Sequence, residues 1–156
     1  MQTAKGEFDG KVAVITASST GIGLAIAKKL ASLGCKVVVS SRDQSHVDKA
    51  VKEIKEAGGQ AHGVACHVGN KDQRLKLISE AVRVFGGIDI LIPNVAVSTH
   101  MGNFLDATST QITKMWEINY ISTFLLIQEA MPELRKRKHS TIVILASYAA
   151  CTVKVK

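Results

Sequence analysis

The chain has 156 residues, 46% of them hydrophobic, and no apolar stretch approaches the roughly 20 residues that cross a bilayer, so we expect a soluble globular protein with no membrane partner. Its formal net charge of +7 raises the question of a nucleic-acid partner, but the densest basic run, "RKRKH", closes a predicted helix and lacks interleaved aromatic residues, so we expect none. The polar N-terminus "MQTAKGEFDGK" lacks the apolar region of a secretory signal, and we expect a cytoplasmic location.

Strands and helices are predicted to alternate along the chain. Apolar, β-branched runs indicate buried strands, and apolar residues at helical spacing followed by glycine indicate helices that end there. The predicted strands are Val12–Thr16, Lys36–Ser40, Ala61–Cys66, Ile88–Ile92 and Thr141–Leu145. The predicted helices are Gly21–Leu33, Gln44–Ala57, Asp72–Phe85 and a long segment from the capping-box sequence "TSTQ" at Thr108 to about Arg137, bent near Asn119 and at Pro132.

The same spacing gathers apolar side chains on one side of each of the first three helices, and in the second helix they are expected to point inward. They are Ile22, Ala25, Ile26, Leu30 and Leu33 in the first helix, Val47, Val51 and Ile54 in the second, and Leu75, Ile78, Val82 and Phe85 in the third. Alternation with short links predicts an α/β fold, a Rossmann-type doubly wound parallel sheet of about five strands between two layers of helices. No linker is visible, so residues 1–156 are expected to form one domain.

The cysteines suggest neither a disulfide framework nor a metal site. Cys35, Cys66 and Cys151 are widely spaced and no C-x-x-C occurs, which favours reduced thiols. His67 follows Cys66 directly, but no second close pair of ligands exists elsewhere, so we expect no metal.

The turn "TASSTGIG", Thr16–Gly23, lies between the first strand and the first helix. A helix that begins there aims unpaired N–H groups and its positive dipole end at the crevice beyond the sheet. Gly21 and Gly23 would let a pyrophosphate approach the backbone, and Ser18, Ser19 and Thr20 supply hydroxyl donors. The alternative is a tight turn that needs glycine for packing alone.

The end of the second strand, "VVVSSRD", bears on which cofactor would bind. An acidic residue about 20 residues past the glycines usually meets a free ribose hydroxyl, but here Ser40, Ser41 and Arg42 stand in that region. A guanidinium beside hydroxyl groups suits the additional phosphate of NADP, which favours NADP over NAD. The alternative is a solvated arginine that Asp43 neutralises.

Several motifs in the same order resemble those of the short-chain dehydrogenase/reductase family. Thr16–Gly23 matches its T-G-x-x-x-G-x-G signature except for Ala17, and "PNVA" resembles its N-N-A-G, with Asn94 at the second asparagine and Ala96 following. "INYIS" carries Asn119 at the family's helix asparagine, and "VILAS" carries Ser147 at its catalytic serine.

Within this family, "VITAS", "VVVSSRDQ", "CHVG" and "GGIDILI" resemble the branch of NADP-dependent carbonyl and retinol reductases that is often peroxisomal. That branch commonly has alanine where Ala17 stands. It also has histidine at His67, where many relatives place an aspartate near the adenine.

The resemblance implies reversible hydride transfer between NADP(H) and a carbonyl or alcohol carbon of a small molecule such as a ketone, dicarbonyl or retinoid. It implies that Ser147 binds the substrate oxygen and that Asn119 helps to hold a water and a lysine in a proton relay. The implied cofactor-binding residues are Thr16, Ser18, Ser19, Gly21, Ile22, Gly23, Ser41, Arg42, His67, Val68, Asn94 and Ala96. It also implies homo-oligomers or association with full-length relatives.

One family motif is absent from these residues. The family's general acid is the tyrosine of Y-x-x-x-K, but Tyr120 is followed four residues later by Phe124, and Tyr148 by Thr152. We therefore expect a truncated oxidoreductase that is inactive or strongly impaired. The alternatives are a non-catalytic NADP(H)-binding module, an isoform that associates with complete subunits, and a product that folds poorly. The terminal "VKVK" does not match a peroxisomal S-K-L signal.

Overall fold

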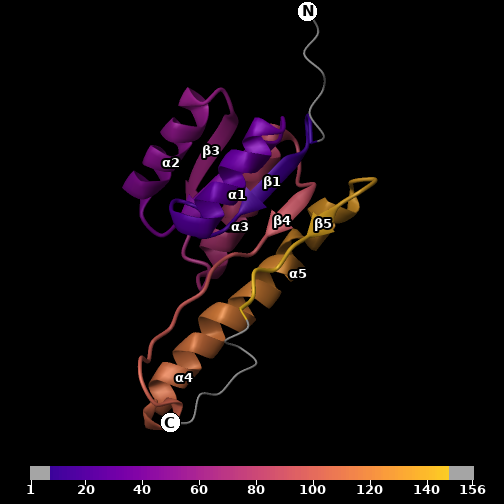
Figure 1. The fold of residues 1–156 in the computed structure, drawn as a ribbon. Coiled ribbons are helices and arrows are strands. Elements are labelled where there is room, and N and C mark those ends of the chain that lie inside the picture. The colour runs from indigo at the N-terminus through magenta and orange to yellow at the C-terminus, as the bar shows by residue number, and fades with distance from the viewer. Residues whose placement is uncertain (1–7, 148–156) are drawn as a thin grey trace, which may run out of the picture.

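The computed structural model describes residues 8–147, without the side chain of Phe104. Five strands form one sheet in the order β3-β2-β1-β4-β5, and every neighbouring pair is parallel (Figure 1). Their bounds are β1 Val12–Ile15, β2 Lys36–Ser41, β3 Gln60–Ala65, β4 Ile90–Ile92 and β5 Thr141–Ile142. The predicted Rossmann-type α/β sheet is confirmed.

Helices connect these strands. They are α1 Gly21–Ser32, α2 Gln44–Glu56, α3 Lys71–Phe85, α4 Ser109–Trp116 and α5 Ser122–Arg135, with a short 3₁₀ helix η1 at Phe104–Asp106. A π-helical turn, η2 Glu117–Ile121, joins α4 to α5. The predicted irregularity near Asn119 is this turn, whereas Pro132 lies inside α5 without ending it.

Two hydrophobic clusters, one on each face of the sheet, form the core. Because side chains alternate along a strand, Val14 and Val38 pack with α3 and α5, while Ala13 and Val37 pack with α1 and α2. Strands β1 and β2 are buried on both faces, which explains their continuous apolar sequences.

The buried face of α1 differs from the apolar side that the spacing indicates. Gly23, Ala27 and Ala31 are buried, whereas the Ile22 side chain is 69% exposed. Small residues let α1 lie close to the sheet directly after β1, and periodicity that counts only large apolar residues overlooks them.

The buried face of α3 also differs from its apolar side. Leu75 is 42% exposed, and its place in the core is taken by Leu77 and by the charged residue Arg74. A buried arginine requires a partner, and that partner is on α5.

Local signals at the helix starts and in the last strand are partly confirmed. Thr108 and Gln111 form the predicted capping box at the start of α4. The last strand is shorter than predicted, although the Val143 and Leu145 N–H groups still donate to carbonyls of Leu91 and Pro93.

No helix within residues 8–147 is both long and apolar enough to cross a membrane.

Candidate functional site

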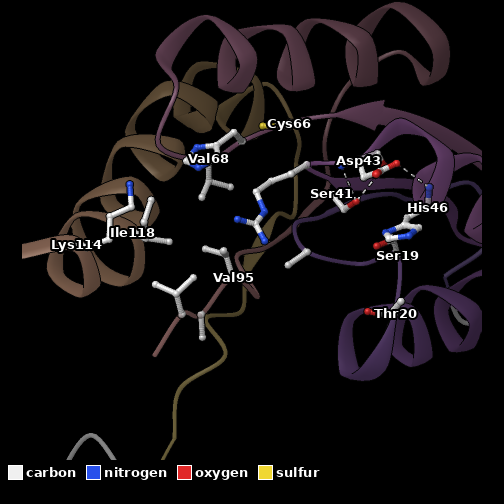
Figure 2. Close-up of a pocket in the computed structure, with 15 residues that line it drawn as sticks. Ser19, Thr20, Ser41, Asp43, His46, Cys66, Val68, Val95, Lys114 and Ile118 are labelled. Carbon is white, nitrogen blue, oxygen red and sulfur yellow. Dashed lines mark hydrogen bonds between the residues drawn. The ribbon is translucent and has the colours of Figure 1, made fainter. Parts of the chain in front are cut away.

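A cavity of about 470 Å³ lies where the carboxyl ends of β1 to β4 meet (Figure 2). Because these strands are parallel, the segments that follow them come together at one edge of the sheet. The cavity lies at the point where strand order reverses, since β2 and β4 flank β1. Six predicted cofactor residues line it: Ser19, Ser41, Arg42, His67, Val68 and Ala96.

The turn between β1 and α1 forms one wall of the cavity. Ala17 has φ 48°, in the left-handed region that favours glycine, and Gly21 has φ 57°. A Cβ at Gly23 would lie 2.5 Å from Asn94 Nδ2 and 2.6 Å from the Ala17 carbonyl oxygen. Gly23 is therefore required so that α1 and the end of β4 can approach each other.

The N-terminus of α1 is prepared for an anion. Within the described part of the chain, the side chain of its N-cap residue, Thr20, forms no capping hydrogen bond, and no acidic residue lies in the first turn. By contrast, Asp43 caps α2 and Asn70 caps α3. The unpaired N–H groups and positive dipole end of α1 thus remain available beside the cavity.

Three predicted cofactor residues, Thr16, Ser18 and Asn94, form hydrogen bonds that hold the backbone of this turn. The buried Ser18 hydroxyl donates to the Ile15 carbonyl at 2.6 Å and accepts from the Ser40 N–H at 3.0 Å. The Ser18 hydroxyl is therefore bonded within the protein, and a contact between it and a cofactor stays a prediction. The Asn94 amide donates to the carbonyls of Thr16 and Ala17, and the Asn94 N–H donates to Thr16 Oγ1, so both residues hold the turn.

Arg42 offers a positive charge to the cavity. In the described part of the chain its guanidinium forms no hydrogen bond or ion pair. The Asp43 carboxylate instead accepts from the Ser45 hydroxyl at 2.6 Å, the Ser45 N–H at 2.7 Å and the His46 N–H at 3.3 Å. These bonds, the Ser45 hydroxyl foremost, lower the pKa of Asp43. Asp43 therefore caps α2, and neutralisation of Arg42 by direct contact is not seen.

Several lining residues were missed by the sequence analysis. His46 lies beside Ser19 in the first turn of α2 (Figure 2), and Lys114 and Ile118 reach the cavity from α4 and η2. His46 lies in the first turn of α2, directly after the loop that carries Arg42, so its closeness to the strand end could have suggested it. The residues around Lys114 in the sequence do not indicate a site, because the packing of α4 brings Lys114 to this edge of the sheet.

The two predicted catalytic residues, Asn119 and Ser147, are not among the residues that line the cavity. Asn119 sits in the π-helical turn, where its side chain accepts from the Val97 N–H at 2.8 Å and donates to the Val97 carbonyl at 2.9 Å. It therefore fixes the backbone of a lining residue, and its role in a relay stays a prediction. Ser147 follows β5 at the end of the described residues, and Tyr148 and Cys151 lie outside them.

Cys66, which also lines the cavity, is a poor nucleophile. Burial raises the pKa of its thiol to about 11, so it remains protonated near neutral pH. Among residues 8–147 no group of three or more His, Cys, Asp or Glu side chains is placed to hold a metal ion.

The sheet order, the crevice and the uncapped α1 N-terminus define a dinucleotide-binding α/β fold. The residues fit such a ligand: the cradle would be obstructed by a side chain at Gly23, and the donors are an unpaired helix end and a guanidinium. The family model for short chain dehydrogenase matches residues 11–155, and the chain belongs to this family of oxidoreductases.

Individual relatives agree with this membership. The chain is 46% identical over 143 residues to dehydrogenase/reductase SDR family member 4 of Bos taurus, a match covering 92% of this chain and 51% of the relative. It is 44% identical over 140 residues to tropinone reductase-like 3 of Erythroxylum coca, covering 90% and 54%. The chain thus spans about half the length of the curated relatives it matches.

Solved structures show the same architecture. A 7 alpha-hydroxysteroid dehydrogenase complexed with NADH and 7-oxo glycochenodeoxycholic acid superposes with a TM-score of 0.88 at 32% identity, covering 95% of this chain and 57% of that one. A short-chain type dehydrogenase/reductase from Mycobacterium marinum also gives 0.88, at 28% identity, covering 96% and 60%. Family membership implies a nicotinamide cofactor, NAD or NADP.

Proposed function

We propose that residues 1–156 form one NADP(H)-binding domain of an oxidoreductase that interconverts carbonyl and alcohol groups of small molecules. The uncapped N-terminus of α1 beside the cavity supports this most directly, because it supplies unpaired N–H donors and positive potential for a pyrophosphate. When bound, the nicotinamide would donate or accept the hydride.

The proposed cofactor-binding residues divide into three groups. The N–H groups of Gly21, Ile22 and Gly23 would bind the pyrophosphate. Arg42 and Ser41 would bind the additional phosphate of NADP, for which a free guanidinium is suited by charge and shape. His67 and Val68 would form the wall beside the adenine, with Ala96 on the β4 side.

Arg42→Ala tests the cofactor choice. We expect NADPH, measured by its fluorescence during titration, to bind about 10- to 100-fold more weakly, because a charge-assisted contact to the phosphate is lost. NADH affinity should change little. Arg135→Ala, at an exposed site in the last turn of α5, is the control and should leave both affinities unchanged. Equal losses for NADH and NADPH would contradict the proposed role of Arg42, and failure of the native chain to bind either cofactor would contradict the proposed function.

A second function is favoured for these 156 residues when they act alone, that of a cofactor-binding module without turnover. Asn119 and Ser147 are present, but Y-x-x-x-K is absent from the sequence, and a general acid contributes typically about 10²–10⁴-fold to rate. An assay of NADPH oxidation with a reactive dicarbonyl should therefore show no appreciable rate. Turnover that disappears in Ser147→Ala would overturn this second proposal. We also propose a cytoplasmic location and association with itself or with longer relatives.

A further inference from the structure

A buried ion pair joins α3 to α5 directly behind the cavity. Arg74 Nε donates to Glu129 Oε2 and Arg74 Nη2 donates to Glu129 Oε1, both at 2.8 Å. The two side chains are only 3% and 13% exposed. Both carboxylate oxygens thus accept from one guanidinium in a bidentate ion pair, and this geometry fixes the plane of the guanidinium.

The third guanidinium nitrogen of Arg74, Nη1, forms a hydrogen bond with a residue that lines the cavity. Arg74 Nη1 donates to the Val68 carbonyl at 2.7 Å, and this bond is buried. Val68 lines the cavity on the same side as Ile118 and Lys114 (Figure 2). The orientation of the Val68 carbonyl is therefore set by a side chain whose own orientation is set by Glu129.

A second clamp holds the preceding residue. The His67 N–H donates to Gln73 Oε1 at 2.7 Å, and the Gly69 N–H donates to His67 Nδ1 at 3.1 Å. Since Gln73 and Arg74 are adjacent on α3, the first turns of this helix hold both wall residues. Arg74 connects that wall to α5 by hydrogen bonds, since it donates both to the Val68 carbonyl and to Glu129.

Stability alone does not require an ion pair at this position. Replacing a buried ion pair by apolar residues of similar volume is often neutral or stabilising, whereas an apolar residue cannot donate to the Val68 carbonyl. We infer that Arg74 and Glu129 are positioning residues that hold the His67–Val68 wall in its cofactor-binding shape. This inference rests on the proposed function, because it gives the wall a ligand.

The experiment replaces both partners at once, as Arg74→Met with Glu129→Leu, in the full 156-residue chain. Three quantities are compared with the native chain: the urea unfolding midpoint, the NADPH dissociation constant from fluorescence titration, and backbone amide exchange across residues 67–70. The matched control is Lys28→Met with Glu53→Leu, an ion pair of 2.7 Å that joins α1 to α2, with neither residue lining the cavity.

We expect the double variant to remain folded and yet to bind NADPH about tenfold more weakly, because the Val68 carbonyl loses its charge-assisted hydrogen bond. Amide exchange should accelerate across residues 67–70 and remain unchanged in the control. A folded variant with native NADPH affinity and native exchange at this loop would overturn the inference.

Two further outcomes remain informative. If the double variant does not fold, Arg74→Lys takes its place, since a lysine can pair with Glu129 but cannot also reach the Val68 carbonyl with a rigid fork. If the native chain binds no NADPH, the proposed function fails, while the exchange measurement still decides whether Arg74 holds the loop.

Discussion

Ala17 is an alanine in a backbone conformation that favours glycine. Its φ of 48° lies in the left-handed region, where an L-residue other than glycine costs roughly 1–2 kcal/mol. The family signature places glycine here. The Asn94 side chain donates to the Ala17 carbonyl at 3.0 Å and to the Thr16 carbonyl at 3.2 Å, and these bonds hold the turn in spite of its strain.

Ala17→Gly should therefore stabilise the chain. We expect the free energy of unfolding to rise by about 0.5–1 kcal/mol, because glycine relieves more strain than it adds in unfolded-state entropy. Urea unfolding measures this change. Ala25→Gly, at an exposed position within α1, is the control and should lower the same quantity by about 1 kcal/mol. The strain argument fails if the two substitutions destabilise equally.

Glu80 is the carboxylate with the most displaced titration among those described. Hydrogen bonds from Arg83 and then from His62 lower its pKa from 4.5 to about 2. Because the folded-state pKa lies below the unfolded-state pKa, the contribution of Glu80 to stability is fully present above pH 4.5 and is lost as pH falls toward 2.

Glu80→Gln tests this pH dependence. The variant should unfold more easily than the native chain above pH 4.5, and the difference should shrink as pH falls toward 2, in urea unfolding followed across that range. Glu56→Gln is the comparison, since Glu56 pairs with Lys52 only at 3.8 Å on an exposed surface. A difference for Glu80→Gln that does not vary with pH would contradict the assignment.

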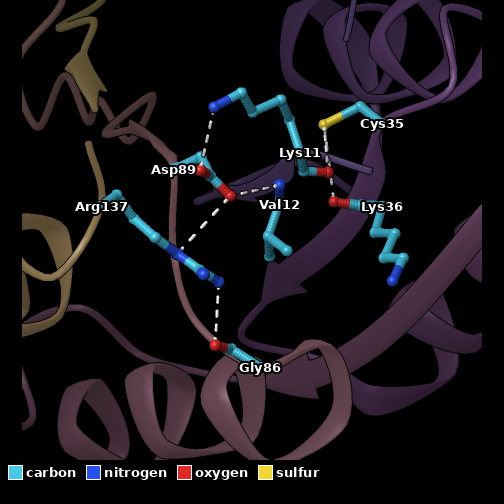
Figure 3. Close-up of polar contacts among 7 residues, drawn as sticks. All are labelled: Lys11, Val12, Cys35, Lys36, Gly86, Asp89 and Arg137. Atoms are coloured by element: carbon cyan, nitrogen blue, oxygen red, sulfur yellow. Dashed lines mark hydrogen bonds and ion pairs between the residues drawn. The ribbon is translucent and has the colours of Figure 1, made fainter. Parts of the chain in front are cut away.

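At the scale of elements, one buried carboxylate ties three segments together at the amino edge of the sheet (Figure 3). Asp89, just before β4, accepts from the Val12 N–H of β1 at 3.0 Å and pairs with Lys11 Nζ at 3.2 Å. Arg137, which follows α5, approaches the same carboxylate at 3.8 Å and donates to the Gly86 carbonyl at 2.8 Å. This cluster lies at the opposite edge from the cavity, so we expect it to act on stability.

Asp89→Asn separates stability from binding. Loss of the buried charge leaves Lys11 and Arg137 without their shared partner, and we expect unfolding to become easier by about 1–3 kcal/mol. The NADPH dissociation constant should not change. Asp48→Asn, on the exposed surface of α2, should stay within about 0.5 kcal/mol of the native chain. A loss of NADPH affinity in folded Asp89→Asn would show that this edge influences the cavity.

At the scale of the whole molecule, the long helical segment α4–η2–α5 presents two different faces. Leu126, Ala130 and Leu134 are buried in the cluster that packs on the sheet. Trp116, Tyr120 and Phe124 follow each other at helical spacing on the opposite face and remain exposed, with Trp116 stacked on Tyr120 at 4.5 Å. Apolar content alone could not decide which of these faces packs, because both are apolar.

Truncation of one residue from each face checks this assignment. Leu126→Ala should lower the free energy of unfolding by about 2–5 kcal/mol, because it opens a cavity in the core. Phe124→Ala, with 57% of its side chain exposed, should change it by less than about 0.5 kcal/mol. Equal effects in urea unfolding would contradict the described packing.

The order of strands and helices could be predicted because it depends on nearby residues. Buried parallel strands require continuous apolar runs such as Val12–Thr16, and the capping box at Thr108 is closed within one helical turn. The same holds for Arg42, which must lie at the cavity edge because it directly follows a strand of a parallel sheet. Ile22 and Leu75 are exposed although they share the apolar side of their helices, because periodicity measures hydrophobicity and not fit against the sheet.

The sequence by itself thus determined the fold class, the glycine turn and the cationic loop of this short-chain dehydrogenase family member, since each follows from local backbone constraints. Only the tertiary structure decided where the polar atoms point. It turned the Ser18 hydroxyl inward and paired Arg74 with Glu129, 55 residues away. A buried charge is stable only with a partner in place, and that partner is supplied by the packing of α3 and α5 on the same face of the sheet, which no local pattern records.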